Sequence, residues 1–495
     1  MVDANILKNM NSNAVISGAK WMTISTIVSS IVGILRLSIL TRFLDKSDFG
    51  IVAVLTLILG LTAMLSDMGF ATVIMHKQDI NRRQFSSLFW IQLAVYSVLY
   101  LVIICFTEPI SLFYNEPILG YLIPLSLLDL LFTGFGKLYE TVLQKNFQFK
   151  IIAIRNIVSC VLSLLLAVLL AIMGCGVYTL VISTLFATAF LSVWNFVLGQ
   201  KHIKLQFCCS IKENIPLIKI GLYQTGTQIV DYLCTKLDVL IIGKFLGMDA
   251  LGLYNLSKEF IFRFIQIINS IVNRVLTPAF SKIQNDKERM CMTYCYVMRS
   301  LTSLTFPVLT IVSILSLQII EVLYGSGYTD AGFLTAILTL ASVGTAVGNP
   351  VRNIIIATGR TDLTFKYIWI RSIFTIPCVY FCSLYSIEMV ALGQVLLSII
   401  DYYLQWRMEI KPSIGLSFIA LSKSFAKQGG FSLLLGVIGF LIFSRNPFLL
   451  NTAIIQVLVY GIIVCMIYLL TMYFFMNNEY SNLVKLVKQT FLVRK

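Results

Sequence analysis

Long apolar stretches recur along the whole chain, and they constrain its fold more than any other feature. A helical stretch of about 18 or more apolar residues is long enough to cross the hydrocarbon core of a lipid bilayer. Of the 495 residues, 58% are hydrophobic and only 12% are charged, whereas about a quarter of the residues of soluble domains are charged. The sequence therefore predicts an all-α integral membrane protein.

We expect about fourteen transmembrane helices from the length and spacing of these stretches. Their approximate ranges are 14–36, 50–75, 86–106, 117–136, 151–173, 176–198, 215–243, 251–280, 300–320, 333–349, 365–386, 388–406, 431–444 and 453–476. An even number of spans places both termini on the same side of the membrane. Most lysines and arginines fall in the segments on that side, so the positive-inside rule predicts cytoplasmic N- and C-termini.

Two short segments recur in the same order in the two halves of the chain. Residues 42–50 (RFLDKSDFG) align without gaps with residues 244–252 (KFLGMDALG), and residues 149–155 (FKIIAIR) align with residues 365–371 (FKYIWIR). Each pair occupies matching positions relative to the predicted spans, which indicates a duplicated six-helix unit. We expect an N-terminal lobe in residues 1–205, a C-terminal lobe in residues 206–410, and two additional transmembrane helices with a basic cytoplasmic tail in residues 411–495.

Polar and charged residues interrupt the first two predicted spans of each half. Each charged residue costs about 2.5–3.5 kcal/mol at the bilayer centre, so such residues should face protein or water. In these spans they recur at steps of three and four, which places them on one face of each helix. The candidates for lining a central, water-filled cavity are Arg36, Asp67, Gln224, Gln228, Asp231, Lys236, Asp238, Asn255, Lys258, Glu259, Arg263, Gln266 and Asn269.

The charges in these stripes suit an anionic substrate. The cations are Arg36, Lys236, Lys258 and Arg263. The acids, which would balance the cations or carry coupling ions, are Asp67, Asp231, Asp238 and Glu259. A structural alternative stays open, because Glu259 and Arg263 can pair within one helix and the lysines near span ends can extend to water.

No catalytic apparatus is visible in the sequence. It has no ATP-binding loop, no serine-hydrolase elbow and no zinc-hydrolase motif, and its cysteines lack the spacing of a metal site. We therefore expect no catalytic residue, no metal and no cofactor. The net charge of +15 lies in short loops between apolar runs, which is not the pattern of a nucleic-acid-binding face.

Four segments carry a resemblance to a known family: Arg36–Gly50, Asp67–Phe70, Asp238–Asn255 and Pro278–Ser281. In these segments the chain resembles bacterial polysaccharide and oligosaccharide flippases (Wzx-type) of the multidrug/oligosaccharidyl-lipid/polysaccharide exporter superfamily. It is most similar to the branch that exports lipopolysaccharide O-units, colanic acid and teichuronic acid. The resemblance covers roughly residues 14–410, and it specifies the family better than the sugar.

The resemblance implies a V-shaped pair of six-helix lobes that moves a lipid-linked oligosaccharide across the bacterial inner membrane by alternating access. The substrate would be a repeat unit on undecaprenyl pyrophosphate, with Arg36, Lys236, Lys258 and Arg263 facing the pyrophosphate or acidic sugars. The implied partners are this substrate, membrane lipids, polysaccharide polymerases and glycosyltransferases. H⁺ and Na⁺ are both candidates for a coupling ion.

Three other functions stay open at this point. The first two are a cation-coupled multidrug exporter and a flippase of the peptidoglycan lipid precursor, both of the same superfamily. The cationic stripes argue against the exporter, because organic cations favour an apolar or acidic cavity. The third, a membrane-embedded polysaccharide polymerase, would need a sizeable outside loop for its acceptor, and every predicted outside loop is short.

Overall fold

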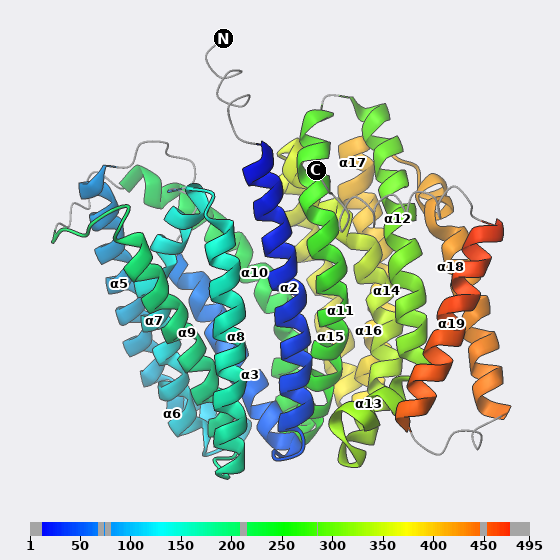
Figure 1. Ribbon diagram of the computed structural model, residues 1–495, viewed down its shortest axis with the longest axis horizontal. Helices are drawn as coiled ribbons and strands as arrows, with labels where there is room; N and C mark the ends of the chain where they lie inside the picture. The colour runs from blue at the N-terminus through cyan, green and yellow to red at the C-terminus, as the bar shows by residue number, and fades with distance from the viewer. Residues whose placement is uncertain are drawn as a thin grey trace. The chain divides into compact units, whose positions relative to one another are not determined.

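The computed structural model describes residues 12–67, 74, 81–207, 215–284, 286–445 and 453–475, and these residues are almost entirely helical (Figure 1). The chain divides into two compact units, Met1–Gly252 and Leu253–Lys495. The lobe boundaries expected after residues 205 and 410 stay predictions. The expected basic tail lies outside the described residues.

The first unit consists of eight described helices and the first residues of a ninth. They are α2 (Ser12–Leu40), α3 (Lys46–Asp67), α5 (Arg82–Cys105), α6 (Thr107–Tyr114), α7 (Leu119–Lys145), α8 (Phe149–Ile172), α9 (Tyr178–Gly199), α10 (Ile215–Phe245) and the beginning of α11 (Gly247–Lys282). Helix α7 packs against α5 and α9, and α8 packs against α2 and α9 (Figure 1). Helix α10 packs along α3.

The second unit contains the rest of α11 and the remaining helices. They are α12 (Lys287–Ile314), α13 (Ser316–Tyr324), η1 (Ser326–Tyr328), α14 (Thr329–Thr358), α15 (Thr361–Ser383), α16 (Ile387–Gln405), η2 (Trp406–Ile410), α17 (Lys411–Ile414), α18 (Phe418–Arg445) and α19 (Ala453–Phe475). Helix α12 packs against α14 and α18, and α14 packs against α16.

Every predicted span overlaps a long helix. Nine of the helices in the described part of the chain are long and apolar enough to cross a membrane, which confirms a multi-pass membrane protein. The other helices that match predicted spans are α10, α11, α15, α18 and α19. The total of fourteen transmembrane helices is compatible with the structure and stays a prediction.

The predicted spans and the observed helices differ in several boundaries, including those at 300–320 and 431–444. The apolar run expected at 300–320 is two helices, because the backbone leaves the helical conformation at Leu315, between α12 and α13. The span expected at 431–444 begins earlier, at Phe418. Lysines and serines in the first turns of α18 hid this start, because they lower the local hydrophobicity on which the prediction depends.

The first repeated segment forms a reciprocal contact inside the first unit. A Cβ atom on Gly50 of α3 would collide with the carbonyl oxygen of Met248, and a Cβ on Gly252 would collide with that of Lys46. In the sequence alignment Gly50 corresponds to Gly252, and Lys46 corresponds to Met248. The glycine of each copy therefore lies against the same alignment position of the other copy, as expected for elements related by an approximate two-fold axis.

Helix α12 contains Pro307, and α19 replaces the hydrogen bond that this proline removes. A proline has no N–H, so the carbonyl of Ser303, four residues earlier, loses its helical hydrogen-bond partner. The Tyr468 hydroxyl of α19 donates to that carbonyl at 2.9 Å. In a bilayer such a free carbonyl must be satisfied by protein, so α19 completes α12.

Candidate functional site

Arg36, the candidate cation of the first predicted span, lies half-buried on α2 and is bound to α9. Its Nη2 donates to the Ser183 hydroxyl at 2.7 Å, to the Thr184 hydroxyl at 3.2 Å and to the Leu180 carbonyl at 3.3 Å. A substrate anion at Arg36 would compete with these hydrogen bonds. In this state the side chain joins two helices of the first unit.

The candidates on α10 change from half-buried to buried along the helix. Asp231 and Lys236 are half-buried, and Asp238 is 3% exposed. An Asp238 oxygen accepts the backbone N–H of Val239 at 2.8 Å. Of these three, Asp231 and Lys236 therefore present the more accessible polar groups.

Sequence analysis missed Tyr232, which fixes α10 against α3. The Tyr232 hydroxyl donates to the carbonyls of Thr56 and Leu57, at 3.1 and 3.2 Å. It occupies the space left by the missing side chain of Gly60, where a Cβ atom would collide with it. A tyrosine inside a helix that already shows a polar stripe gives no sequence signal of this role.

Three of the predicted charges lie on α11, within the second unit, and two of them form an ion pair. An Nη atom of Arg263 lies 3.8 Å from a carboxylate oxygen of Glu259, and the two side chains are 25% and 38% exposed. The Lys258 ammonium lies 5.5 Å from the centre of the Tyr254 ring, one turn earlier. The same helix presents Asn255, half-buried, and Gln266, exposed.

The Glu259–Arg263 contact has the geometry of the pairing within one helix that the sequence allowed. Its 3.8 Å separation exceeds the length of a hydrogen bond, so the pair is loose. A loose pair with both partners partly exposed can exchange one partner for another anion. The pairing and a role in substrate binding are therefore compatible.

Four candidates cannot be placed in this way. The side chains of Asp67, Gln224, Gln228 and Asn269 lie outside the described residues. The central cavity expected between the two halves, and the grouping of all candidate residues around it, stay predictions. Among the described residues there is no cluster of three histidine, cysteine or acidic side chains that could hold a metal ion.

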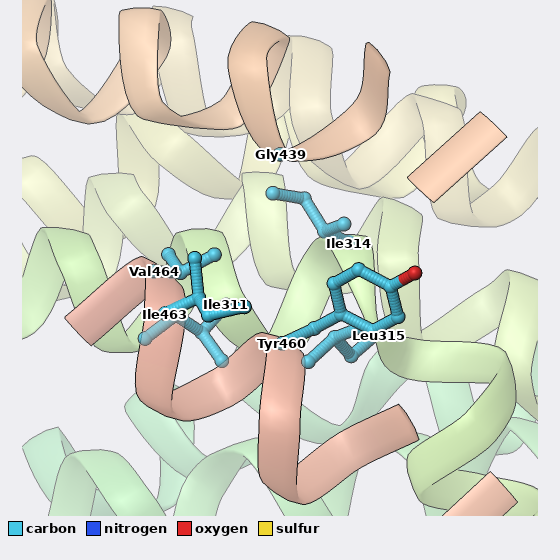
Figure 2. A pocket seen from close by; sticks show the side chains of 7 residues that line it. All are labelled: Ile311, Ile314, Leu315, Gly439, Tyr460, Ile463 and Val464. Atoms are coloured by element: carbon cyan, nitrogen blue, oxygen red, sulfur yellow. The ribbon is translucent and has the colours of Figure 1, made fainter. Parts of the chain in front are cut away.

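A small apolar pocket lies between α12, α18 and α19 (Figure 2). Its lining includes Ile311 and Ile314 of α12, Gly439 of α18, and Ile463 and Val464 of α19. No charged residue contributes to this lining. Because pyrophosphates and sugars require hydrogen-bond donors and cations, the pocket has the wrong chemistry for the polar part of such a substrate.

A second buried charge, which sequence analysis noted only as part of a repeat, is Arg155 of α8. Its side chain is 2% exposed and lies 3.5 Å from Glu140 of α7. It also donates to the side-chain oxygens of Asn195, on α9, and of Asn156, the latter at 2.7 Å. These partners join α7, α8 and α9, so Arg155 has a structural role.

Sequence comparisons match this chain to proteins of polysaccharide biosynthesis and transport. A family model described as "Polysaccharide biosynthesis protein" matches residues 39–332, more than half of the chain. The lipopolysaccharide biosynthesis protein WzxC of Escherichia coli (strain K12) is 26% identical, over 81% of this chain and 82% of its own length. The teichuronic acid biosynthesis protein TuaB of Bacillus subtilis (strain 168) is 24% identical, over 71% and 73%. The succinoglycan biosynthesis transport protein ExoT of Rhizobium meliloti (strain 1021) is 25% identical, over 67% of each chain.

Solved structures show the same fold at low sequence identity. The lipid II flippase MurJ in an inward closed conformation superposes with a TM-score of 0.71 at 16% identity, covering 92% of this chain and 98% of that one. An inward-facing multidrug resistance MATE family transporter of the MOP superfamily gives 0.59 at 12% identity, covering 81% and 100%. The fold is thus that of these transporters, and the chain belongs to the polysaccharide biosynthesis protein family.

Proposed function

We propose that this protein is a flippase that moves lipid-linked oligosaccharide repeat units across the bacterial inner membrane for the synthesis of a surface polysaccharide. It acts by alternating access, without catalysis, cofactor or metal, and with both termini in the cytoplasm. Its molecular partners are the lipid-linked oligosaccharide and the surrounding lipids, together with the polymerase and glycosyltransferases that handle the same repeat unit.

The partly exposed Glu259–Arg263 pair on α11 is the observation that carries this proposal. A charged group on a helix that matches a predicted span is costly unless it faces protein or water, and such groups by default indicate a functional site. Here the cation is only loosely held by its acidic neighbour. A polar headgroup that crosses the bilayer beside such a cation avoids the hydrocarbon, while its polyprenyl chain stays in lipid.

The relatives point to the class of cargo. Three of them are named for the biosynthesis or transport of lipopolysaccharide, teichuronic acid and succinoglycan. The two solved structures, a lipid II flippase and a multidrug transporter, support only the fold. A surface polysaccharide unit therefore has more support than a drug or a peptidoglycan precursor.

The test is complementation in a bacterium that lacks its own O-unit flippase, with surface polysaccharide and lipid-linked precursors measured together. Wild type should restore the surface polymer and lower the accumulated precursor. Arg263→Gln should reduce the rescue by about 10- to 100-fold, the effect of losing a hydrogen bond to a charged group. Arg289→Ala is the matched control, because Arg289 belongs to another helical ion pair and is 71% exposed.

Glu259→Gln separates substrate binding from a purely structural pair. If Arg263 binds the cargo, Glu259→Gln keeps most of the rescue, since it removes only a competitor for the guanidinium. If the pair only stabilises α11, the two variants lose rescue equally and protein levels fall with it. No rescue by well-expressed wild type, together with dye efflux, would replace the proposal with drug export. Reconstitution with imposed H⁺ or Na⁺ gradients identifies the coupling ion.

A further inference from the structure

Tyr324, at the C-terminal end of α13 and outside every predicted span, packs against Phe260 of α11, the helix that carries the Glu259–Arg263 pair. Its side chain is 1% exposed, and its ring packs edge-on against Phe260 with 6.5 Å between the ring centres. One turn earlier on α11, the Ser257 hydroxyl donates to the Ala331 carbonyl at 2.9 Å and fixes α11 against the start of α14. The position of the phenol relative to Glu259 and Arg263 is therefore set by packing on both sides.

Two buried donors at this place make no hydrogen bond with any described residue: the Tyr324 hydroxyl and the Nε of Arg263. An unsatisfied buried polar group is costly, and in a native structure each one calls for an explanation. Burial raises the pKa of the Tyr324 hydroxyl, while the nearby charge of Arg263 lowers it and that of Glu259 raises it. The hydroxyl therefore remains protonated and can donate at neutral pH.

The chemistry of the three groups limits what could satisfy them. The guanidinium and the phenol both offer donors, and a positive charge favours an anionic acceptor. A carboxylate oxygen of Glu259 lies 3.8 Å from the guanidinium of Arg263, which is too far for a hydrogen bond of normal length. The Arg263 side chain is 25% exposed although its Nε is buried, so an anion can approach the other guanidinium atoms and reaches the Nε by displacing Glu259.

We propose that Tyr324 and Arg263 together form an oxyanion site, in which the phenol hydroxyl and the guanidinium Nε donate to one anionic oxygen of the cargo. Tyr324 is then a substrate-binding residue, and the recognised group is a phosphate or a carboxylate. This inference rests on the proposed flippase function and adds to it the part of the cargo that the second unit recognises. A phosphate oxygen belongs to the lipid carrier, and a carboxylate belongs to an acidic sugar.

The experiment measures binding of two probes, inorganic pyrophosphate and galacturonate, to the purified full-length protein in detergent by titration calorimetry. Tyr324→Phe removes only the hydroxyl, and it should weaken binding of the recognised probe about tenfold. Without a probe, its melting temperature should equal or exceed that of wild type, because the removed group has no described partner. The probe that responds identifies the source of the anion.

Tyr294→Phe is the matched control. The Tyr294 hydroxyl is also fully buried and without a hydrogen-bond partner among the described residues, but it lies in the second turn of α12, whereas α13 follows the opposite end of that helix. Its loss should leave the affinity unchanged. An equal loss in both variants would show a general effect of buried hydroxyls and would overturn the assignment.

The outcomes separate this inference from the proposed function. If Arg263→Gln weakens probe binding and Tyr324→Phe does not, the role of Tyr324 is overturned and the flippase proposal stands. If wild type binds neither probe at millimolar concentration but complements the flippase-deficient strain, the oxyanion site is overturned and the function stands. Failure in both assays overturns both.

Discussion

Two arginines occupy the same position of the second repeated segment, yet their surroundings differ. Arg155 of α8 is 2% exposed, is hydrogen-bonded to Asn156 and Asn195, and lies 3.5 Å from Glu140. Arg371 of α15 is 37% exposed and lies 3.3 Å from Asp401 of α16. The duplication of a sequence segment thus fixes where a charge lies along a helix, whereas the neighbouring helices decide how much water reaches it.

The difference extends to the partners of each arginine. Arg155 is enclosed by residues of three helices, so its charge is compensated entirely by protein. Asp401 also accepts a hydrogen bond from the Tyr367 hydroxyl at 2.6 Å, on the same oxygen that faces Arg371. The carboxylate of the second half therefore has two partners on α15 and keeps one of them if the other is lost.

The largest effect is expected for Arg155→Met. Removing one partner of a buried charge network costs up to about 3–5 kcal/mol, and here it leaves the buried Asn195 and the partly exposed Glu140 without their cation. We expect little folded protein at 37 °C and a strongly lowered melting temperature in detergent. Glu140 is 32% exposed, so the double variant Arg155→Met/Glu140→Gln should recover part of the loss. A melting temperature of Arg155→Met equal to that of wild type would contradict the comparison.

A smaller effect is expected at the other repeated segment, where the two copies behave alike. Gly50→Ala and Gly252→Ala should each cost about 1–3 kcal/mol, since each adds a methyl group where a carbonyl oxygen already lies. The double variant should cost less than the sum, because both substitutions separate the same two helices. Gly461→Ala is the control, because no atom lies within 4 Å of its added Cβ. Strongly unequal effects at Gly50 and Gly252 would show that the contact is not reciprocal.

The smallest effect is expected for Arg371→Met. Partly exposed ion pairs contribute about 0–1 kcal/mol, and Asp401 keeps its hydrogen bond from Tyr367. Thermal unfolding in detergent should therefore distinguish Arg371→Met from Arg155→Met by several degrees. If the two variants lose the same stability, the difference in exposure between the two arginines does not affect stability. The Arg371 network is then as well shielded from water as the Arg155 network.

Local patterns were sufficient to predict most of the fold. The positions of the long helices followed from the lengths of apolar runs, because a membrane span is a local property of about 20 residues. The pairing of Glu259 with Arg263 was also predictable, since residues four apart are neighbours on any helix. The break at Leu315 was missed because the apolar pattern continues through it. The early start of α18 was missed because the apolar pattern is weak in its first turns.

By itself, the sequence determined that this chain is a multi-pass helical membrane protein with a repeated segment in each half and charges on the helices that begin each half. Only the tertiary structure decided the partners of those charges. Arg36 is bound to α9, Arg155 is enclosed by three helices, and the ring of Tyr324 on α13 packs against Phe260 of α11, one turn before Arg263. The physical reason is that hydropathy and helical period are set by neighbouring residues, whereas burial and hydrogen bonding depend on segments far apart in the chain.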